Sequence, residues 1–191
     1  MDMNKTKTVY CDMDGVTASY ITSTELFQAV ERGMKMRIDT EQVMNDFVSK
    51  MGKAGFFLGL FPNNAFISGL KLFNSKHPEI PIKILSSLNG TPYCEDEKKK
   101  WLARYMPEFL ETAIFVPCGH AKAEYVEDIE NSILLDDFSR NLHTWASWGG
   151  TGVKVKNGIN GRYGSWSGLS INLFGTPEEI CKTLEDIVIG C

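Results

Sequence analysis

The sequence predicts an α/β fold in which helices flank a mainly parallel β-sheet. Beyond residue 79, short runs rich in apolar and β-branched residues alternate with stretches of helical periodicity, and several of these runs end in Asp or Ser. The chain has 191 residues, of which 43% are hydrophobic and 23% charged, which suits one globular domain with an insertion. Because strands that alternate with helices are joined by right-handed crossovers, we expect them to pair in parallel.

The first strand is predicted at residues 8–11, and a long helical region follows it. In this region Leu26, Val30 and Met34 recur every four residues, as expected for one face of a helix. Residues 52–66 interrupt the pattern with glycine, proline and four phenylalanines before the helical periodicity resumes. The first strand is therefore followed by several helical segments rather than one.

The connection between the first and second strands is far longer than a single crossover needs. The excess is explained most simply by a helical insertion that lies over the sheet. We therefore expect a core domain of residues 1–17 and 79–191, with a small helical cap of residues 18–78 inserted after the first strand.

After the cap, strands and helices alternate regularly. Four further strands are predicted, at residues 80–87, 112–117, 132–137 and 152–155. Four helices follow them, at residues 95–106, 121–129, 139–148 and 176–189. The last helix begins with a capping box, in which Thr176 is the N-cap, Pro177 the first helical residue and Glu179 the returning acid.

Composition narrows the classes of protein. The net charge of −4 argues against a stable nucleic-acid partner, which requires a basic face. The five cysteines are scattered without Cys-x-x-Cys spacing, so neither a zinc site nor a disulfide framework is indicated. The polar N-terminus and the lack of a bilayer-spanning apolar run favour a cytoplasmic protein without a membrane partner. The composition leaves open whether the protein forms a homodimer.

Polar side chains gather where the predicted strands end. The carboxyl ends of parallel strands share one edge of the sheet, and ligands bind there. The residues placed at this edge are Asp12, Asp14, Ser86, Ser87, Lys122, Asp136 and Asp137. Four carboxylates repel one another unless a cation lies between them, and hard oxygen ligands without His or Cys suit Mg²⁺. We therefore predict a Mg²⁺ site, with a phosphate that the lysine and the serine hydroxyls would contact.

Asp12 and Asp14 fit the chemistry of phosphoryl transfer. An aspartate that faces a phosphate beside Mg²⁺ can act as the nucleophile and form an aspartyl-phosphate. The side chain two residues later projects to the same face of an extended backbone, so it can protonate the leaving oxygen and then activate water. The pair alone also fits a solvated turn, but not an EF-hand calcium loop, because Gly15 is at the fourth position instead of the sixth.

These motifs, in this order, resemble those of the haloacid dehalogenase (HAD) superfamily of phosphotransferases. The matching stretches are "DMDGV", "ILSS", Lys122 and "LLDD". The resemblance implies a Rossmann-like core with a helical cap. It also implies Asp12 as nucleophile, Asp14 as acid–base, Ser86 and Lys122 as phosphate ligands, and Asp136 and Asp137 as the acidic pair. This pair would hold Mg²⁺ together with Asp12 and the backbone carbonyl of Asp14.

A narrower resemblance is to the 5′(3′)-deoxyribonucleotidases. "GFFLGLFPNNAFISGLK" is similar to their cap segment, "CEDEKKKW" to their Glu-Lys-x-x-Trp stretch, and "LLDDFSRN" to their Asp-Asp-x-x-x-Asn. The resemblance implies Phe56, Phe57 and Lys98 as substrate contacts beside Ser86, Ser87 and Lys122. Each also has a simpler interpretation, since the phenylalanines suit a core and Lys98 suits a solvated helix face.

We therefore expect a Mg²⁺-dependent phosphomonoesterase that forms a phospho-aspartate and acts on (deoxy)nucleoside monophosphates. Three alternatives stay open at this point. The substrate is another small phosphate ester, or it is the phosphorylated 3′ end of a polynucleotide, or the protein binds a phosphate ligand without catalysis. The order of the motifs favours an enzyme that retains all its catalytic positions.

Overall fold

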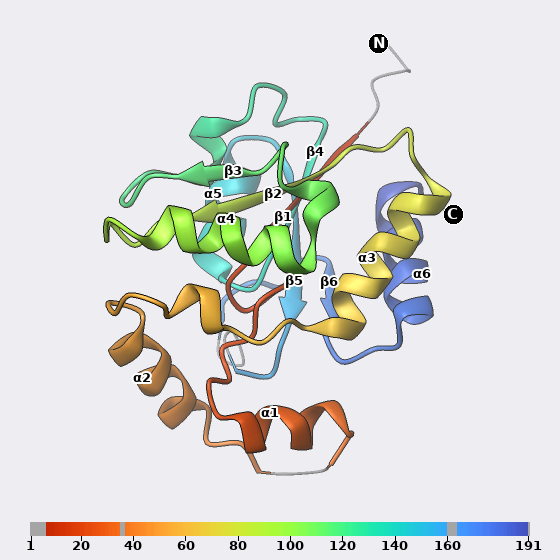
Figure 1. Cartoon of the computed structure of the whole chain (residues 1–191). Helices are drawn as coiled ribbons and strands as arrows, with labels where there is room; N and C mark the ends of the chain where they lie inside the picture. The colour runs from red at the N-terminus through yellow and green to blue at the C-terminus, as the bar shows by residue number, and fades with distance from the viewer. Residues whose placement is uncertain (1–6, 35–36, 160–163, 191) are drawn as a thin grey trace.

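A computed structural model describes residues 7–34, 37–159 and 164–190 (Figure 1). Its centre is a six-stranded sheet with the order β3-β2-β1-β4-β5-β6. All neighbouring strands in it pair in parallel. The strands are β1 (Thr8–Cys11), β2 (Ile82–Ser87), β3 (Ile114–Val116), β4 (Ser132–Asp136), β5 (Thr151–Lys156) and β6 (Ser170–Asn172). This is the predicted α/β, Rossmann-like fold.

Strand β1 lies in the middle of the sheet and is covered on both faces. Successive side chains of a strand point to opposite faces. Val9 and Cys11 accordingly join the larger apolar cluster, whereas Tyr10 joins a second cluster with Leu134 and Trp145. A short, continuously apolar strand is what a doubly covered parallel sheet requires.

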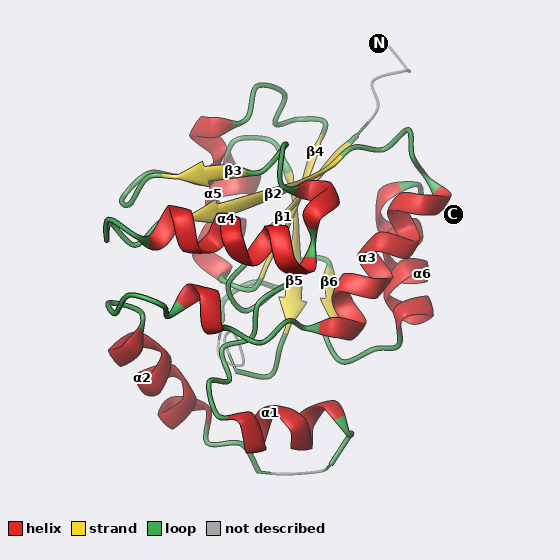
Figure 2. Ribbon diagram, viewed as in Figure 1, coloured by secondary structure: helices red, strands yellow, loops and turns green. Residues whose placement is uncertain are grey.

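Helices cover both faces of the sheet (Figure 2). They are α1 (Thr24–Glu31), α2 (Thr40–Lys50), α3 (Asn64–Lys76), α4 (Cys94–Tyr105), α5 (Ser139–Ser147) and α6 (Pro177–Val188). Three short 3₁₀ helices are η1 (Phe57–Gly59), η2 (Pro107–Phe109) and η3 (Lys122–Tyr125). The buried apolar side chains of α3, α4 and α6 belong to the larger apolar cluster, and those of α5 belong to the second. Among the described residues, no helix has the length and apolarity to cross a membrane.

Two elements differ from the prediction. Residues 121–129, predicted as a short helix, form only the single 3₁₀ turn η3. Strand β6 was not predicted, because three residues at the sheet edge carry too little periodicity to be recognised. Both differences concern short segments whose conformation is set by neighbours in space.

Helices α1 and α2 lie apart from the sheet, on the side toward which β5 points (Figure 1). Two chain segments lead to them side by side, since Ser19 N–H donates to Phe61 O and Asn63 N–H to Thr17 O. These helices fall in the predicted cap range of residues 18–78, whose boundaries stay a prediction.

Helix α3 falls in the same range but packs along α6 (Figure 1). The two helices approach closely at Gly69, where a Cβ atom would lie 2.5 Å from the Ile180 side chain. A glycine at this position permits the contact. Helix α3 thereby contributes to the apolar cluster beneath the sheet.

Candidate active site

The loop after β1 is shaped by a backbone that only glycine accepts. Asp12 extends the ladder of β1, because its N–H donates to Leu135 O at 2.9 Å. Gly15 then has a φ of 77°, and a Cβ atom there would lie 2.2 Å from the Tyr20 ring and 2.5 Å from Asp137 Oδ2. The tight turn at Gly15 brings the β1 loop close to Asp137.

Lys122 joins the ends of β1 and β4. Its ammonium lies 2.8 Å from Asp12 Oδ1 and 2.7 Å from Asp136 Oδ2, and the residue is 4% exposed. Burial opposes the charged form of the lysine, but the two carboxylates outweigh it and raise the pKa of Lys122 above its ordinary value. The side chain therefore stays a cation at the point where two strands end.

Lys98 joins β2 to the β1 loop from the other side. It lies on α4 and is completely buried. Its Nζ donates to Asp14 Oδ2 at 2.9 Å, to Ser86 Oγ at 2.9 Å and to the Ser87 carbonyl at 2.8 Å. Burial raises the pKa of the Asp14 carboxyl, and the Lys98 ammonium opposes that rise.

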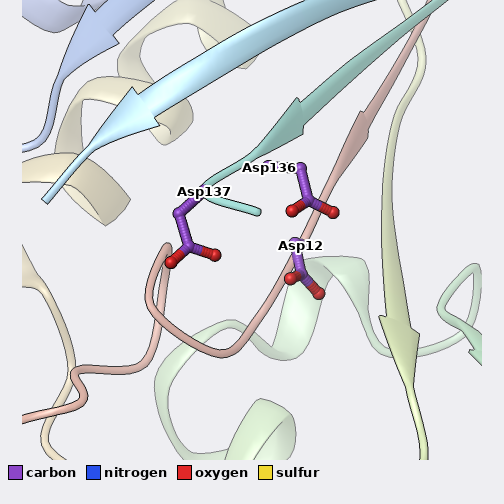
Figure 3. Close-up of side chains that lie close together, drawn as sticks. All are labelled: Asp12, Asp136 and Asp137. Carbon is purple, nitrogen blue, oxygen red and sulfur yellow. The ribbon is translucent and has the colours of Figure 1, made fainter. Parts of the chain in front are cut away.

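Three aspartates form a cluster that suits a metal ion (Figure 3). Asp12, Asp136 and Asp137 each offer one carboxylate oxygen, all within 4.8 Å of one another, and all three residues are buried. Burial raises the pKa of the Asp136 carboxyl, although Lys122 opposes this. Since Mg²⁺ prefers carboxylate oxygens, the donor set fits this ion.

The predicted substrate contacts have different surroundings. Ser86 is buried beside Lys98, whereas Ser87 is exposed and contributes its carbonyl to that lysine. Phe57 is 1% exposed, and its ring centroid lies 4.9 Å from the Lys98 ammonium. Phe56 is half-buried and contacts the rings of Phe57 and Phe47.

Helix α4 also holds the chain segment around η1. The carboxylate of Glu97 accepts hydrogen bonds from the backbone N–H groups of Gly55 and Phe57. Trp101 Nε1 donates to Leu60 O at 2.8 Å. The Glu-Lys-x-x-Trp stretch therefore places Lys98 between two anchors for this segment.

Sequence reasoning missed two residues of the site. Lys154 on β5 is buried and donates to the Asp137 carbonyl and, at 3.0 Å, to Ser139 Oγ. Asn157 donates to the Gly15 carbonyl at 2.8 Å and to Asp137 Oδ2 at 2.9 Å. A sequence signal exists for each of them. Lys154 is a lysine inside an apolar strand, and Asn157 is a polar residue just after the end of that strand.

A cavity of about 530 Å³ borders the site. It lies between α1 and the ends of β5 and β6, and Gly15 and Asn157 belong to its wall. Apolar side chains, among them Tyr20 and Phe27, form much of the remainder. The acidic cluster thus adjoins a space large enough for a small molecule.

No protein-family model matches the sequence, and no curated protein matches it significantly. The structure, however, is similar to solved structures. A HAD-superfamily hydrolase from Ehrlichia chaffeensis aligns with a TM-score of 0.56 and 13% identity, over 95% of this chain and 100% of that one.

Two further structures are similar over most of their length. D,D-heptose 1,7-bisphosphate phosphatase from Burkholderia thailandensis aligns with a TM-score of 0.55 and 13% identity, over 95% of this chain and 98% of that one. A HAD hydrolase of family IA, variant 3, from Entamoeba histolytica aligns with a TM-score of 0.51 and 16% identity, over 94% and 99%. The chain therefore has the fold of the HAD-superfamily hydrolases.

Proposed function

We propose that this protein is a Mg²⁺-dependent phosphomonoesterase of the HAD type, which forms a phospho-aspartate on Asp12. The observation that carries the proposal is the buried group of Asp12, Asp136, Asp137 and Lys122 at the carboxyl edge of the sheet. Three buried carboxylates around one ammonium group leave excess negative charge, which is costly unless the site binds a further cation. The fold shared with HAD hydrolases supports the same reaction class.

In the first step, a carboxylate oxygen of Asp12 attacks phosphorus, and the bond between phosphorus and the leaving oxygen breaks. Asp14 gives its proton to that leaving oxygen. In the second step, water attacks the phosphoryl group on Asp12, Asp14 takes the proton of the water, and phosphate leaves while the Asp12 carboxylate re-forms. Both side chains end in their initial state, Asp12 as a carboxylate and Asp14 protonated.

Lys122 and Ser86 stabilise the charge of the transferring group. Lys122 stays cationic, because two carboxylates raise its pKa. A fixed cation in a buried site stabilises the phosphoryl oxygens more strongly than it would in water. The hydroxyl of Ser86 is buried at the end of β2 and provides a neutral donor.

We propose that Mg²⁺ is held by the carboxylates of Asp12 and Asp137 and by the backbone carbonyl of Asp14. Both carboxylate oxygens of Asp136 already accept hydrogen bonds: Oδ1 from Phe138 N–H at 2.7 Å, and Oδ2 from Lys122 and Asn141. This supports Asp136 as the residue that orients Lys122. When bound, the ion would neutralise part of the negative charge of the carboxylates and of the phosphate.

The substrate that we propose is a (deoxy)nucleoside monophosphate. The adjoining cavity supports a small substrate, and the aromatic rings of Tyr20 and Phe27 in its wall support a planar group. Helices α1 and α2 beyond the strand ends disfavour a polynucleotide end, which needs an open channel. Other small phosphate esters remain the competing substrate class.

We also propose a reducing compartment, the cytoplasm, as the place of action. Cys11, Cys94, Cys118 and Cys181 are free thiols, and three of the four are buried. Thiols that stay reduced are typical of intracellular proteins.

A phosphate-release screen tests this function. Nucleoside 5′- and 3′-monophosphates, sugar phosphates and oligonucleotides are offered with Mg²⁺ or with EDTA. We expect Mg²⁺-dependent release that is highest for mononucleotides, and a loss of at least about a thousandfold in Asp12→Asn with an unchanged fold by circular dichroism. Appreciable Mg²⁺-dependent turnover in Asp12→Asn would contradict the mechanism, and strong turnover of another ester alone would contradict the substrate class.

A further inference from the structure

We infer that Lys98 is a positioning residue, which orients Asp14 for proton transfer and Ser86 for phosphate contact without itself binding the substrate. The inference rests on the proposed function and assigns Lys98 a different task from the substrate contact implied by the sequence. It follows from the number of hydrogen-bond donors that Lys98 has and from what each of them contacts.

An ammonium group has three N–H donors and no acceptor. The three donors of Lys98 match the three acceptors around it, which are Asp14 Oδ2, Ser86 Oγ and the carbonyl of Ser87. All three distances lie between 2.8 and 2.9 Å, and the side chain is completely buried. No donor is left for a phosphoryl oxygen.

The bond to Asp14 distinguishes the two oxygens of its carboxylate. Oδ2 is held by Lys98, whereas Oδ1 is buried and has no hydrogen-bond partner among the described residues. A buried oxygen without a partner is costly unless a ligand supplies one. Oδ1 is therefore the atom that exchanges a proton with the leaving oxygen and with water.

The bond to Ser86 orients its hydroxyl group. Because Ser86 Oγ accepts from Lys98, its own hydrogen must point away from the ammonium. The hydrogen is then available to a phosphoryl oxygen at the end of β2. One buried cation thereby sets both the acid–base residue and the phosphate-binding hydroxyl.

The surroundings keep Lys98 in place. The face of the Phe57 ring lies against its ammonium, at 4.9 Å from the ring centroid. The neighbouring Glu97 holds the backbone of the same phenylalanine. The Lys98 side chain is thus fixed at its base by helix α4, to which it belongs, and at its ammonium end by the η1 segment.

The experiment compares two phosphate esters, because general-acid catalysis matters most for a poor leaving group. Lys98→Met removes the ammonium and keeps an unbranched side chain. We measure kcat/KM, which reports the step that releases the leaving group, for p-nitrophenyl phosphate and for an alkyl phosphate. We expect a loss of about a hundredfold or more for the alkyl ester and of less than about tenfold for the aryl ester.

Three further variants complete the comparison. Asp14→Asn should likewise lose more kcat/KM with the alkyl ester than with the aryl ester. The double variant Lys98→Met with Asp14→Asn should have a kcat/KM no lower than that of Asp14→Asn alone. Lys99→Met is the matched control, since the adjacent Lys99 is exposed and pairs with Glu95. It should leave both rates unchanged.

An equal loss for both esters in Lys98→Met, or a raised KM with an unchanged kcat, would overturn the inference in favour of direct phosphate binding. If Lys98→Met does not fold, Lys98→Arg keeps the cation but cannot reproduce three separate contacts, and it should show the same split to a smaller extent. An equal loss in that variant would again contradict the inference. A wild type that hydrolyses neither ester would overturn the proposed function as well. If wild type is active and Asp12→Asn is inactive, the proposed function holds, and a contrary result for Lys98→Met then counts against the role of Lys98 alone.

Discussion

Two buried lysines face the same short loop, and we propose different tasks for them. Lys122 contacts Asp12 and Asp136, and Lys98 contacts Asp14, Ser86 and the Ser87 backbone. Lys122 lies between two carboxylates, whereas Lys98 has one carboxylate and two neutral acceptors. In the proposed mechanism, the partners of a buried cation, more than its identity, determine whether it stabilises charge or orients its neighbours.

The largest effect is expected from Lys122→Met. Removing the cation leaves the buried carboxylates of Asp12 and Asp136 facing each other, which costs about 3–5 kcal/mol of unfolding free energy. Urea unfolding in EDTA measures this cost. In contrast to Lys98→Met, the remaining activity should fall equally for aryl and alkyl esters. A split between the esters would mean that the two lysines share one task.

A third buried lysine extends the comparison. Lys154 holds the Asp137 carbonyl and Ser139 Oγ, and burial lowers its pKa although Asp137 opposes this. Lys154→Met should raise the Mg²⁺ concentration for half-maximal activity by about 10–100-fold. The reason is that the backbone at Asp137 loses the hydrogen bond that Lys154 donates to its carbonyl. Calorimetric titration with Mg²⁺ gives an independent value. An unchanged Mg²⁺ affinity would show that Lys154 only fills space.

A neutral residue tests whether charge is needed for positioning. Asn157 bridges the Gly15 carbonyl and Asp137 Oδ2. Asn157→Ala should lower the unfolding free energy by about 1–3 kcal/mol and weaken Mg²⁺ binding. The control Asn131→Ala removes an exposed amide that contacts Asp128, and it should change neither quantity. Equal behaviour of the two variants would contradict a role for Asn157 in the site.

The smallest effect is expected at Glu185, in an ion-pair cluster between α3 and α6. His77, the C-cap of α3, and Lys76, its last residue, contact Glu185 on α6 and lower the pKa of the Glu185 carboxyl. A carboxyl whose pKa is lowered by folding stabilises the protein above its unfolded pKa and loses this contribution as the pH falls through its folded pKa.

The corresponding variant is Glu185→Gln. It should be slightly less stable than wild type at neutral pH and equal to it in acid, as thermal melts at both pH values would show. A difference that persists in acid would mean that packing, and not charge, is responsible.

Most of the site follows from one rule applied to the sequence. Carboxyl ends of parallel strands meet at one edge, so polar residues that end such strands were expected together. Asp12, Asp136 and Ser86 lie there, as does Lys122, although the predicted helix at residue 122 is only a 3₁₀ turn. Strand ends are recognisable because apolar runs stop at them.

The burial of Lys98 could not be predicted, because it depends on how a helix face is oriented. The buried face of α4 includes Glu97 and Lys98 beside Trp101. Apolar periodicity cannot identify a buried face that carries charge, so the solvated interpretation of Lys98 was equally consistent with the sequence. The partners that offset its burial lie far away in the chain, at Asp14 and Ser86.

The most direct test of the phospho-aspartate mechanism is to trap the phosphorylated enzyme. Wild type and Asp14→Asn are mixed with p-nitrophenyl phosphate and Mg²⁺, quenched in acid within milliseconds and examined by peptide mass spectrometry. We expect one phosphoryl group on Asp12, which accumulates in Asp14→Asn because water is no longer activated. Release of phosphate without a phosphorylated peptide, or phosphorylation at another residue, would contradict it.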